Sequence, residues 1–360
     1  MNPTAQLHGA GQSLWLDNIT RDLLTSGTLA RYAADLSVTG LTSNPTIYDK
    51  AIGGSSAYDD DIRERKRAGE RDEDVFFGLA LDDLRQAADL FRPVFERTHR
   101  VDGYVSLEVS PLLAHDADAT IREAARLHAL GGKPNLLIKI PGTLQGLRAI
   151  EETIFAGVPV NVTLLFSARQ YLAAAEAYTR GIERRIEAGL DPLIGSVASL
   201  FVSRWDTAVT GKVPADLHLE LGITTARIAY REYRRFLESD RWQRLLNAGA
   251  RPQRLLWAST GTKDKTASDV LYVEALAAPY TVNTMPDDTL HAFANHGSGA
   301  RLLTPDEAGA DAMLARFEAA GVAVEELAGQ LQQQGADAFK TSWDSLIGRI
   351  ETKAAAMAGI

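Results

Sequence analysis

Residues 135–142 read NLLIKIPG, a short apolar run that ends in turn residues and is interrupted by one charge. Seven similar runs occur elsewhere: SLWLDNI (13–19), SVTGLTSN (37–44), YVSLEVSP (104–111), PVNVTLLF (159–166), LIGSVASLF (193–201), RLLWAST (254–260) and YTVNTMP (280–286). The segments between them, including 74–91, 119–130 and 168–189, place apolar residues at the three- and four-residue spacing of an amphipathic helix. The pattern predicts eight strands that alternate with helices.

Eight strand–helix units can form a closed barrel or an open doubly wound sheet. No GxGxxG follows the first strand and no GxxxxGK[ST] occurs, so the two commonest nucleotide motifs of open sheets are absent from the sequence. We therefore predict an α/β fold in which residues 1–360 form a single (β/α)8 TIM barrel domain. The polar residues 45–73 predict a helical insertion after the second strand, and residues 305–360 predict a helical C-terminal extension.

Composition excludes several classes of protein. Apolar residues make up 45% and charged residues 24%, which is ordinary for a folded domain and unlike a disordered chain. The net charge of -9 argues against a nucleic-acid partner, although a local basic pocket for a small phosphate is compatible with it. The chain has no cysteine, no basic leader followed by a long apolar core, and no apolar run of membrane-spanning length. We expect a cytoplasmic protein with no membrane partner.

Three predicted strands carry a charge. Lys139 interrupts LLIKI, Asp17 ends LWLD, and Glu108 interrupts VSLEV. A charge within a doubly covered strand costs several kcal/mol unless it is paired or used. Lys139 could form a buried ion pair or extend its amine from a strand end. Alternatively, burial could favour its neutral amine, which attacks carbonyl groups. The other eight of the nine lysines fall in predicted helices or loops, which makes Lys139 the candidate nucleophile.

Other polar residues share strand faces with these charges. Residues two apart on a strand point to the same side, which groups Ser106 with Glu108 and Ser110. The same spacing groups Asn161 with Thr163 on the fifth strand. Each set lies toward the C-terminal half of its strand, where barrel enzymes build their active sites. The pattern therefore predicts a catalytic site at the C-terminal end of the barrel.

These stretches resemble the successive strand motifs of the transaldolase family, in the family's order and along nearly the whole chain. The resemblance rests on LWLDNI, TGLTSNPTIY, VSLEVSP, NLLIKIPGT, NVTLLFS and SLFVSRW, with WASTGTKD and YTVNTMPDDTL near the seventh and eighth strands. It implies a transferase of the non-oxidative pentose phosphate pathway, which needs no cofactor or metal. Such an enzyme converts sedoheptulose 7-phosphate and glyceraldehyde 3-phosphate to erythrose 4-phosphate and fructose 6-phosphate by moving a dihydroxyacetone unit.

The resemblance also implies catalytic roles. Lys139 would form a Schiff base with the substrate, and Asp17 would be the general acid/base. Glu108 and Thr163 would hold a water that relays protons during imine formation. Of these, Lys139, Asp17 and Glu108 are the three charged residues that the strand pattern singles out by itself.

Substrate-binding roles follow from the same resemblance. Asn44 and Asn161 would bind sugar hydroxyls, with Thr42 and Ser199 lining the cavity. Arg204, Ser259 and Lys263 would form the phosphate pocket. Many transaldolases have an arginine two residues after the serine of the seventh strand, but this chain has Gly261 there. The assignment of Lys263 therefore assumes a shift of two residues.

Other functions remain as alternatives. A metal-dependent aldolase on the same barrel would need clustered ligands, whereas the seven histidines are scattered, and His291 and His296 are expected on a surface helix. A plain aldolase could use the same lysine and release dihydroxyacetone, although the small aldolases of this superfamily lack the insertion and the C-terminal extension. A catalytically silent barrel is the non-enzymatic alternative. We expect sugar phosphates as binding partners and leave the oligomeric state open between monomer and homodimer.

Overall fold

The computed structural model describes residues 2–298, 301–304 and 309–358. Its strands are β1 (Ser13–Leu16), β2 (Val38–Leu41), β3 (Val105–Glu108), β4 (Leu136–Pro141), β5 (Val160–Leu165), β6 (Ser196–Phe201), β7 (Arg254–Ala258) and β8 (Val282–Met285). All paired strands are parallel and follow the order β2-β1-β8-β7-β6-β5-β4-β3. The backbone N–H of Leu41 donates to the carbonyl of Tyr104 at 3.0 Å, which joins the two ends of the sheet. The predicted eight-stranded barrel is confirmed.

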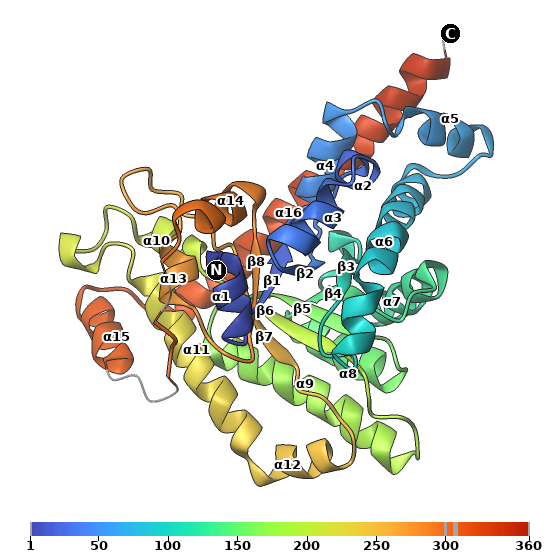
Figure 1. Cartoon of the computed structure of the whole chain (residues 1–360). Helices are drawn as coiled ribbons and strands as arrows, with labels where there is room; N and C mark the ends of the chain where they lie inside the picture. The colour runs from blue at the N-terminus through green and yellow to red at the C-terminus, as the bar shows by residue number, and fades with distance from the viewer. Residues whose placement is uncertain (1, 299–300, 305–308, 359–360) are drawn as a thin grey trace.

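Helices connect the strands and surround the barrel (Figure 1). The first half contains α1 (Pro3–Gly9), α2 (Arg21–Thr25), α3 (Thr28–Asp35), α4 (Pro45–Gly54), α5 (Asp59–Arg67), α6 (Asp72–Arg97), a 3-10 turn (Pro111–Leu113), α7 (Ala117–Gly131), α8 (Leu144–Phe155) and α9 (Ala168–Glu187). The second half contains α10 (Ser203–Val209), a 3-10 turn (Ala215–Leu217), α11 (Leu221–Glu238), α12 (Asp240–Asn247), α13 (Leu271–Ala275), α14 (Asp287–His296), α15 (Ala310–Ala319) and α16 (Val324–Ala358).

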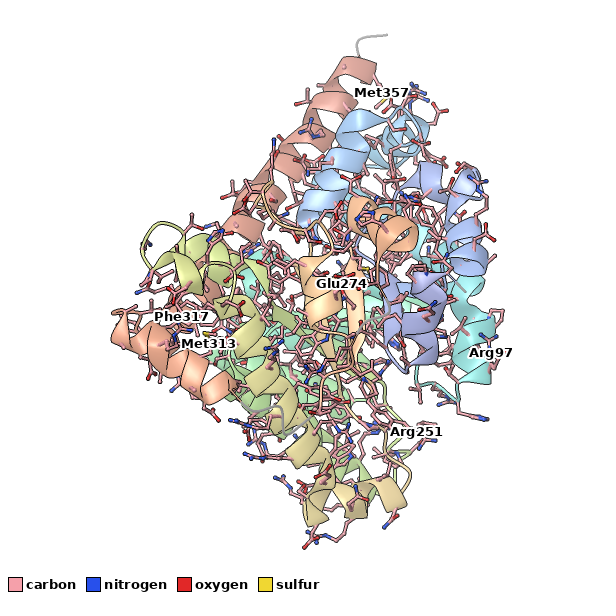
Figure 2. All side chains as sticks on the ribbon, turned by 60° about the vertical axis from the view of Figure 1, so that its left-hand side comes forward. Arg97, Arg251, Glu274, Met313, Phe317 and Met357 are labelled. Carbon is pink, nitrogen blue, oxygen red and sulfur yellow. The ribbon has the colours of Figure 1, made fainter. Side chains whose placement is uncertain are left out.

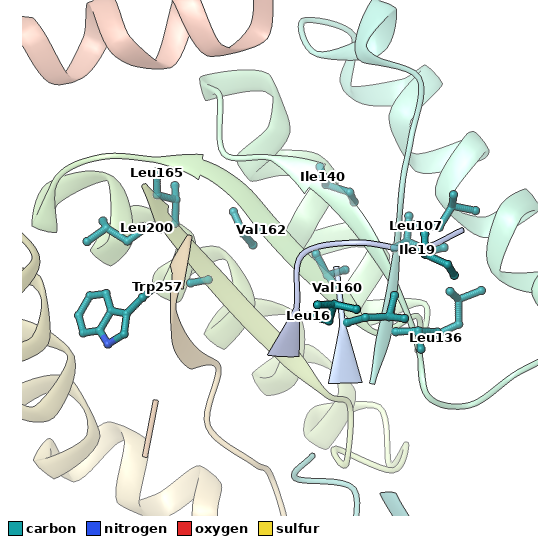
Figure 3. Close-up of a cluster of buried hydrophobic side chains, with 14 of the residues drawn as sticks. Leu16, Ile19, Leu107, Leu136, Ile140, Val160, Val162, Leu165, Leu200 and Trp257 are labelled. Atoms are coloured by element: carbon teal, nitrogen blue, oxygen red, sulfur yellow. The ribbon is translucent and has the colours of Figure 1, made fainter. Parts of the chain in front are cut away.

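The strands separate an outer apolar layer from a barrel interior that holds both polar and apolar side chains. On β4 and β5, Ile140, Val160 and Val162 belong to the large cluster that packs the strands against the helices, and Figure 3 draws this layer. The alternating residues Asn161 and Thr163 are fully buried within the barrel instead. Because neighbouring strand residues point to opposite sides, one apolar strand can both anchor the helices and carry reactive side chains inward.

The N-terminal end of the barrel is closed by a buried polar cluster. Trp15 Nε1 donates to Asp102 Oδ1 at 2.8 Å, and Ser13 Oγ donates to the other carboxylate oxygen at 2.5 Å. Arg254 Nη2 donates to the same Ser13 hydroxyl at 2.8 Å. Each buried polar atom in this group gains a partner, so the cluster closes the barrel without leaving the Asp102 charge unpaired. Trp15 is therefore part of the barrel core.

The predicted insertion and extension are both helical, and they pack on each other. Figure 1 shows α16 running beside α4, which is part of the insertion. Arg349 Nε of α16 donates to Asp49 of α4 at 2.6 Å, and Lys353 pairs with Asp59 of α5 at 2.5 Å. The Trp343 ring of α16 packs against Phe76 with 5.2 Å between the ring centroids. Residues 305–308 and 359–360 of the predicted extension lie outside the described residues.

No described helix combines the length and the apolar character that a membrane span requires.

Candidate active site

A cavity of about 370 Å³ opens at the C-terminal ends of the strands. The barrel strands and the loops that follow them contribute Asp17, Thr42, Lys139, Thr163, Ser199, Phe201, Arg204, Ala258, Ser259, Gly261, Lys263, Thr284 and Pro286. The remaining wall comes from Asn44, Thr46, Ile47 and Lys50 around α4 and from Phe339 of α16. Nine of the eleven predicted site residues line this cavity, and Glu108 and Asn161 do not.

Lys139 lies deep in the cavity with 4% of its surface exposed. Its Nζ is 3.0 Å from Glu108 Oε2 and donates to the carbonyl of Ser43 at 3.2 Å. The two strands bring the pair together directly, because Glu108 of β3 is in register with Lys139 of β4. Burial raises the pKa of Glu108, and the adjacent ammonium opposes that rise. The structure thus contains the buried ion pair that we considered, and it places that pair beside a substrate-sized cavity.

Asp17 projects into the cavity from the end of β1. Its Oδ1 accepts a hydrogen bond of 2.7 Å from Thr42 Oγ1, which also lies 2.7 Å from Thr284 Oγ1. Burial raises the pKa of Asp17, while Lys139, the Thr42 hydroxyl and Lys263 oppose the rise. A carboxyl whose pKa moves toward neutrality can both donate and accept a proton near physiological pH.

A second group of polar side chains is connected to Ser199 in the wall of the cavity. Ser199 Oγ donates to Asn161 Oδ1 at 2.8 Å, and Asn161 Nδ2 donates to Ser106 Oγ at 3.0 Å. Asn161 is thereby held behind Ser199 instead of lining the cavity. Thr163 Oγ1 is buried and has no hydrogen-bond partner among the described residues. Its hydroxyl is therefore free to bind a water or a substrate oxygen from the cavity.

Cations dominate the charge of the cavity, although the whole chain is acidic. Lys50, Lys139, Arg204 and Lys263 line it, against the single lining carboxylate of Asp17. Of the four, only Lys139 forms an ion pair within the described residues. Unpaired cations on a concave surface attract an anionic ligand. This excess of positive charge provides the local basic pocket that the overall composition allowed.

Arg204 and Ser259 occupy one side of this basic wall. Arg204 is the second residue of helix α10, just beyond β6, and its guanidinium carbon lies 5.3 Å from the centre of the Phe201 ring. Burial lowers the pKa of Arg204. Ser259 Oγ lies 2.8 Å from Ser203 Oγ, and its backbone adopts a left-handed conformation with φ of 56°. Non-glycine residues in that conformation are uncommon and concentrate at functional sites.

The position of Gly261 bears on the predicted two-residue shift. A Cβ atom at Gly261 would lie 4.0 Å from Lys263 Nζ. The Lys263 amine therefore reaches the space into which a side chain at position 261 would begin to project. The geometry is compatible with Lys263 supplying the cation that the arginine supplies in many relatives of the family named above.

Two residues that the sequence analysis did not predict, Lys50 of α4 and Phe339 of α16, also line the cavity. Lys50 lies on the helix that the predicted residue Asn44 caps, where Asn44 accepts a hydrogen bond of 3.1 Å from the Ile47 N–H. Phe339 of α16 places its ring 5.3 Å from Lys139 Nζ. A helical phenylalanine 200 residues beyond Lys139 carries no sequence signal of such a contact. A helical lysine such as Lys50 is equally inconspicuous.

A metal-dependent aldolase would need a cluster of His, Asp or Glu side chains that could hold a metal ion. Residues 2–298, 301–304 and 309–358 contain no such cluster. His291 and His296 lie on α14, the helix after the last strand, as expected. Nε2 of His291 is 2.7 Å from the Tyr32 hydroxyl, and Nε2 of His296 is 2.8 Å from Asp269. Both rings thus point to partners outside the cavity.

Known proteins resemble this chain along nearly its whole length. The family model described as "Transaldolase/Fructose-6-phosphate aldolase" matches residues 14–350. A transaldolase of Frankia alni is 44% identical over 358 residues, which cover 97% of this chain and 96% of the relative. A transaldolase of Thermobifida fusca is 44% identical over 99% of both chains. The protein named transaldolase 2 of a Nostoc species is 41% identical over 98% of both chains.

Proposed function

Because this chain belongs to the transaldolase/fructose-6-phosphate aldolase family, we propose that it is a transaldolase that works through a Schiff base on Lys139. Its reaction would transfer a dihydroxyacetone unit from sedoheptulose 7-phosphate to glyceraldehyde 3-phosphate, giving erythrose 4-phosphate and fructose 6-phosphate. The observation that carries the proposal is the buried Lys139–Glu108 pair, 3.0 Å apart, at a cavity that is also lined by one carboxylate and by three cations with no ion-pair partner in the described part of the chain.

The lysine chemistry accounts for the burial of Lys139 beside Glu108. Its neutral amine adds to the ketose carbonyl at C2, and loss of water gives an iminium ion. The iminium withdraws the electron pair of the C3–C4 bond, which leaves an enamine on the enzyme and an aldose as leaving group. Glu108 can accept the ammonium proton before the attack, because the pair is in direct contact and burial favours a neutral carboxyl.

Asp17 is the proposed general acid/base of the cleavage step. Its carboxylate takes the proton of the C4 hydroxyl as the C3–C4 bond breaks, and it returns a proton when the new bond forms. Thr42 orients the carboxyl through the 2.7 Å hydrogen bond, and Thr284 fixes Thr42 in turn. Asp17 and Lys139 line the same cavity, so the carboxyl can act on a substrate that is bound to the lysine.

We propose that Glu108 and Thr163 together hold a water. The Thr163 hydroxyl supports this role because it is buried and has no hydrogen-bond partner among the described residues. Glu108 already contacts Lys139, so a water held by both residues would lie close to the reacting nitrogen. We further propose that Asn44 and Ser199 bind sugar hydroxyls, and that Asn161 supports Ser199 through their 2.8 Å hydrogen bond.

The phosphate of the substrate is proposed to bind Arg204, Ser259 and Lys263. Arg204 offers a planar fork of donors that fits two phosphate oxygens, whereas Lys263 offers one mobile charge. Neither cation forms an ion pair among the described residues, so both are available to bind a dianion. We also propose that residues 1–360 act as one domain and that the enzyme works in the cytoplasm.

Trapping with borohydride tests the proposed nucleophile. Fructose 6-phosphate and sodium borohydride should add one reduced three-carbon or six-carbon tag, and peptide mass mapping should place it on Lys139. Lys263 and Lys50 are internal controls, because both line the same cavity without being buried in a strand. A tag on either control, or an active enzyme that acquires no tag, would exclude the mechanism.

A further inference from the structure

Phe339 stands out among the cavity residues because it belongs to none of the eight strand–loop units. It comes from α16, is 6% exposed, and lies with its ring centre 5.3 Å from Lys139 Nζ. It also belongs to the apolar cluster that continues from the barrel interior, through Leu137 and Leu164, into α16. A ring in this position covers the reactive nitrogen on the side of the C-terminal helix.

Several contacts hold α16 in this position. Gln332 Nε2, two turns before Phe339, donates to the carbonyls of Gly142 at 3.0 Å and Leu164 at 2.9 Å, which lie at the ends of β4 and β5. Ser342 Oγ, one turn after Phe339, lies 2.8 Å from Thr46 Oγ1 of α4. The phenylalanine therefore sits between two anchored points, so its ring has little freedom to leave Lys139.

The chemistry at Lys139 gives this cover a function that rests on the proposed Schiff base. After C3–C4 cleavage, the enamine has two fates. Its carbon can attack the aldehyde of an acceptor sugar, which is transfer. Otherwise the carbon takes a proton, water adds its oxygen to C2, and the C2–Nζ bond breaks to release dihydroxyacetone and the free amine. Water near the nitrogen favours release, and its exclusion favours transfer.

We propose that Phe339 is a specificity-determining residue that shields the covalent intermediate on Lys139 from water and so favours transfer over release. The ring supplies apolar cover, and its face lies within the distance at which an aromatic ring attracts a cation such as the iminium. Every turnover still ends with hydrolysis of a product imine. The Phe339 ring therefore favours reaction of the enamine with the acceptor aldehyde over its hydrolysis, without excluding water entirely.

The test measures the partition between the two fates. Fructose 6-phosphate is the donor and erythrose 4-phosphate, below saturation, is the acceptor, and the readout is dihydroxyacetone released per sedoheptulose 7-phosphate formed. Phe339→Ala and Phe339→Gln should raise this ratio at least about tenfold, because both admit water. Phe339→Leu should stay within about threefold of the parent, because it keeps apolar bulk. Phe317→Ala is the matched control, since Phe317 is also buried, with 0% of its surface exposed against 6% for Phe339. It lies on α15 (Figure 2) and does not line the cavity.

The outcomes separate this inference from the proposed function. If the parent enzyme forms no reducible adduct on Lys139, the Schiff base itself is wrong. If the adduct forms but folded Phe339→Ala and Phe339→Gln keep the parent ratio, the shield is wrong and the Schiff base stands. A similar rise in Phe317→Ala would mean that loosened packing alone changes the partition, and it would also overturn the proposal. If the alanine variant does not fold, Phe339→Gln, which retains the side-chain length, decides the question.

Discussion

Replacing Arg204 with alanine should weaken the use of phosphorylated donors far more than it weakens the fold. Arg204 forms no ion pair among the described residues, and burial lowers its pKa, so the folded enzyme already bears the cost of desolvating this cation. Its contact with the Phe201 ring, at 5.3 Å, contributes about 2 kcal/mol or less, which the relief of that desolvation cost offsets in the alanine variant. The Tm of Arg204→Ala should therefore stay close to that of the parent.

The expected loss is in binding a phosphate several bonds from the reacting carbon. Removing one charged partner of a buried, hydrogen-bonded pair costs about 2–4 kcal/mol, which is about 30- to 900-fold in kcat/KM for fructose 6-phosphate. Lys263 is exposed, so Lys263→Ala should cost about 1 kcal/mol or less. Neither change should matter much for unphosphorylated fructose, because the anchor is used only by the phosphate.

The assay compares kcat/KM for the phosphorylated donor with kcat/KM for the unphosphorylated donor in each variant. Arg204→Ala should reduce this ratio by the full factor and Lys263→Ala by much less. Arg204→Lys should recover only part of the loss, because a lysine cannot make the bidentate contact. An unchanged ratio in Arg204→Ala would refute the reasoning and would place the phosphate elsewhere, with Lys50 of α4 as the next cation to test.

Further predictions concern the carboxyl groups and metal dependence. Asp17→Asn should still form the imine but slow C–C cleavage by about a hundredfold or more, so trapped adduct should accumulate; undiminished turnover would assign the proton to another group. Glu108→Gln should instead slow imine formation, and stalling of both variants at one step would contradict this division of roles. The acid limb of the kcat/KM profile should lie above the usual aspartate range, because burial raises the pKa of Asp17, and Asp17→Asn should abolish that limb. The same raised pKa means that the unfolded state binds fewer protons than the native state between the unfolded and native pKa values, so the free energy of unfolding falls as pH rises through this window. Asp17→Asn should thus raise the free energy of unfolding at pH 7, as measured by urea titration. This gain should vanish below the pKa that Asp17 has in the unfolded state. EDTA should leave activity intact, whereas loss of activity that a divalent ion restores would revive the metal-dependent aldolase.

The strands were predictable because their pattern is local. A run such as PVNVTLLF needs only its own residues to show that it is short, apolar and buried, and β5 forms within it, at Val160–Leu165. The same locality identified Lys139, because a charge inside an apolar strand is visible without any partner. The grouping of Asn161 with Thr163 on one face followed from the two-residue repeat of a strand.

The partners of these residues were not predictable in the same way. Sequence similarity suggested that Glu108 holds a water. Its direct contact with Lys139 is visible only in the structure, because it depends on the register in which β3 and β4 pair. Asn161 was expected to bind a sugar hydroxyl, and its hydrogen bond from Ser199 is a contact that the sequence did not indicate. Register between strands depends on barrel closure and on a whole set of packing contacts, so no single strand encodes it.

The amino-acid sequence alone thus determined the barrel, the end of it that carries the candidate site, and the candidate nucleophile, because each depends on the periodicity of short segments. Only the tertiary structure decided that Lys263 Nζ lies 4.0 Å from the Cβ position of Gly261, and that Phe339 covers Lys139. The first distance depends on the conformation of the loop that follows β7. The second contact joins a strand to a helix residue 200 positions further along the chain. They arise when the chain buries its apolar surface as a whole, which is a property of the packed molecule and not of any one segment.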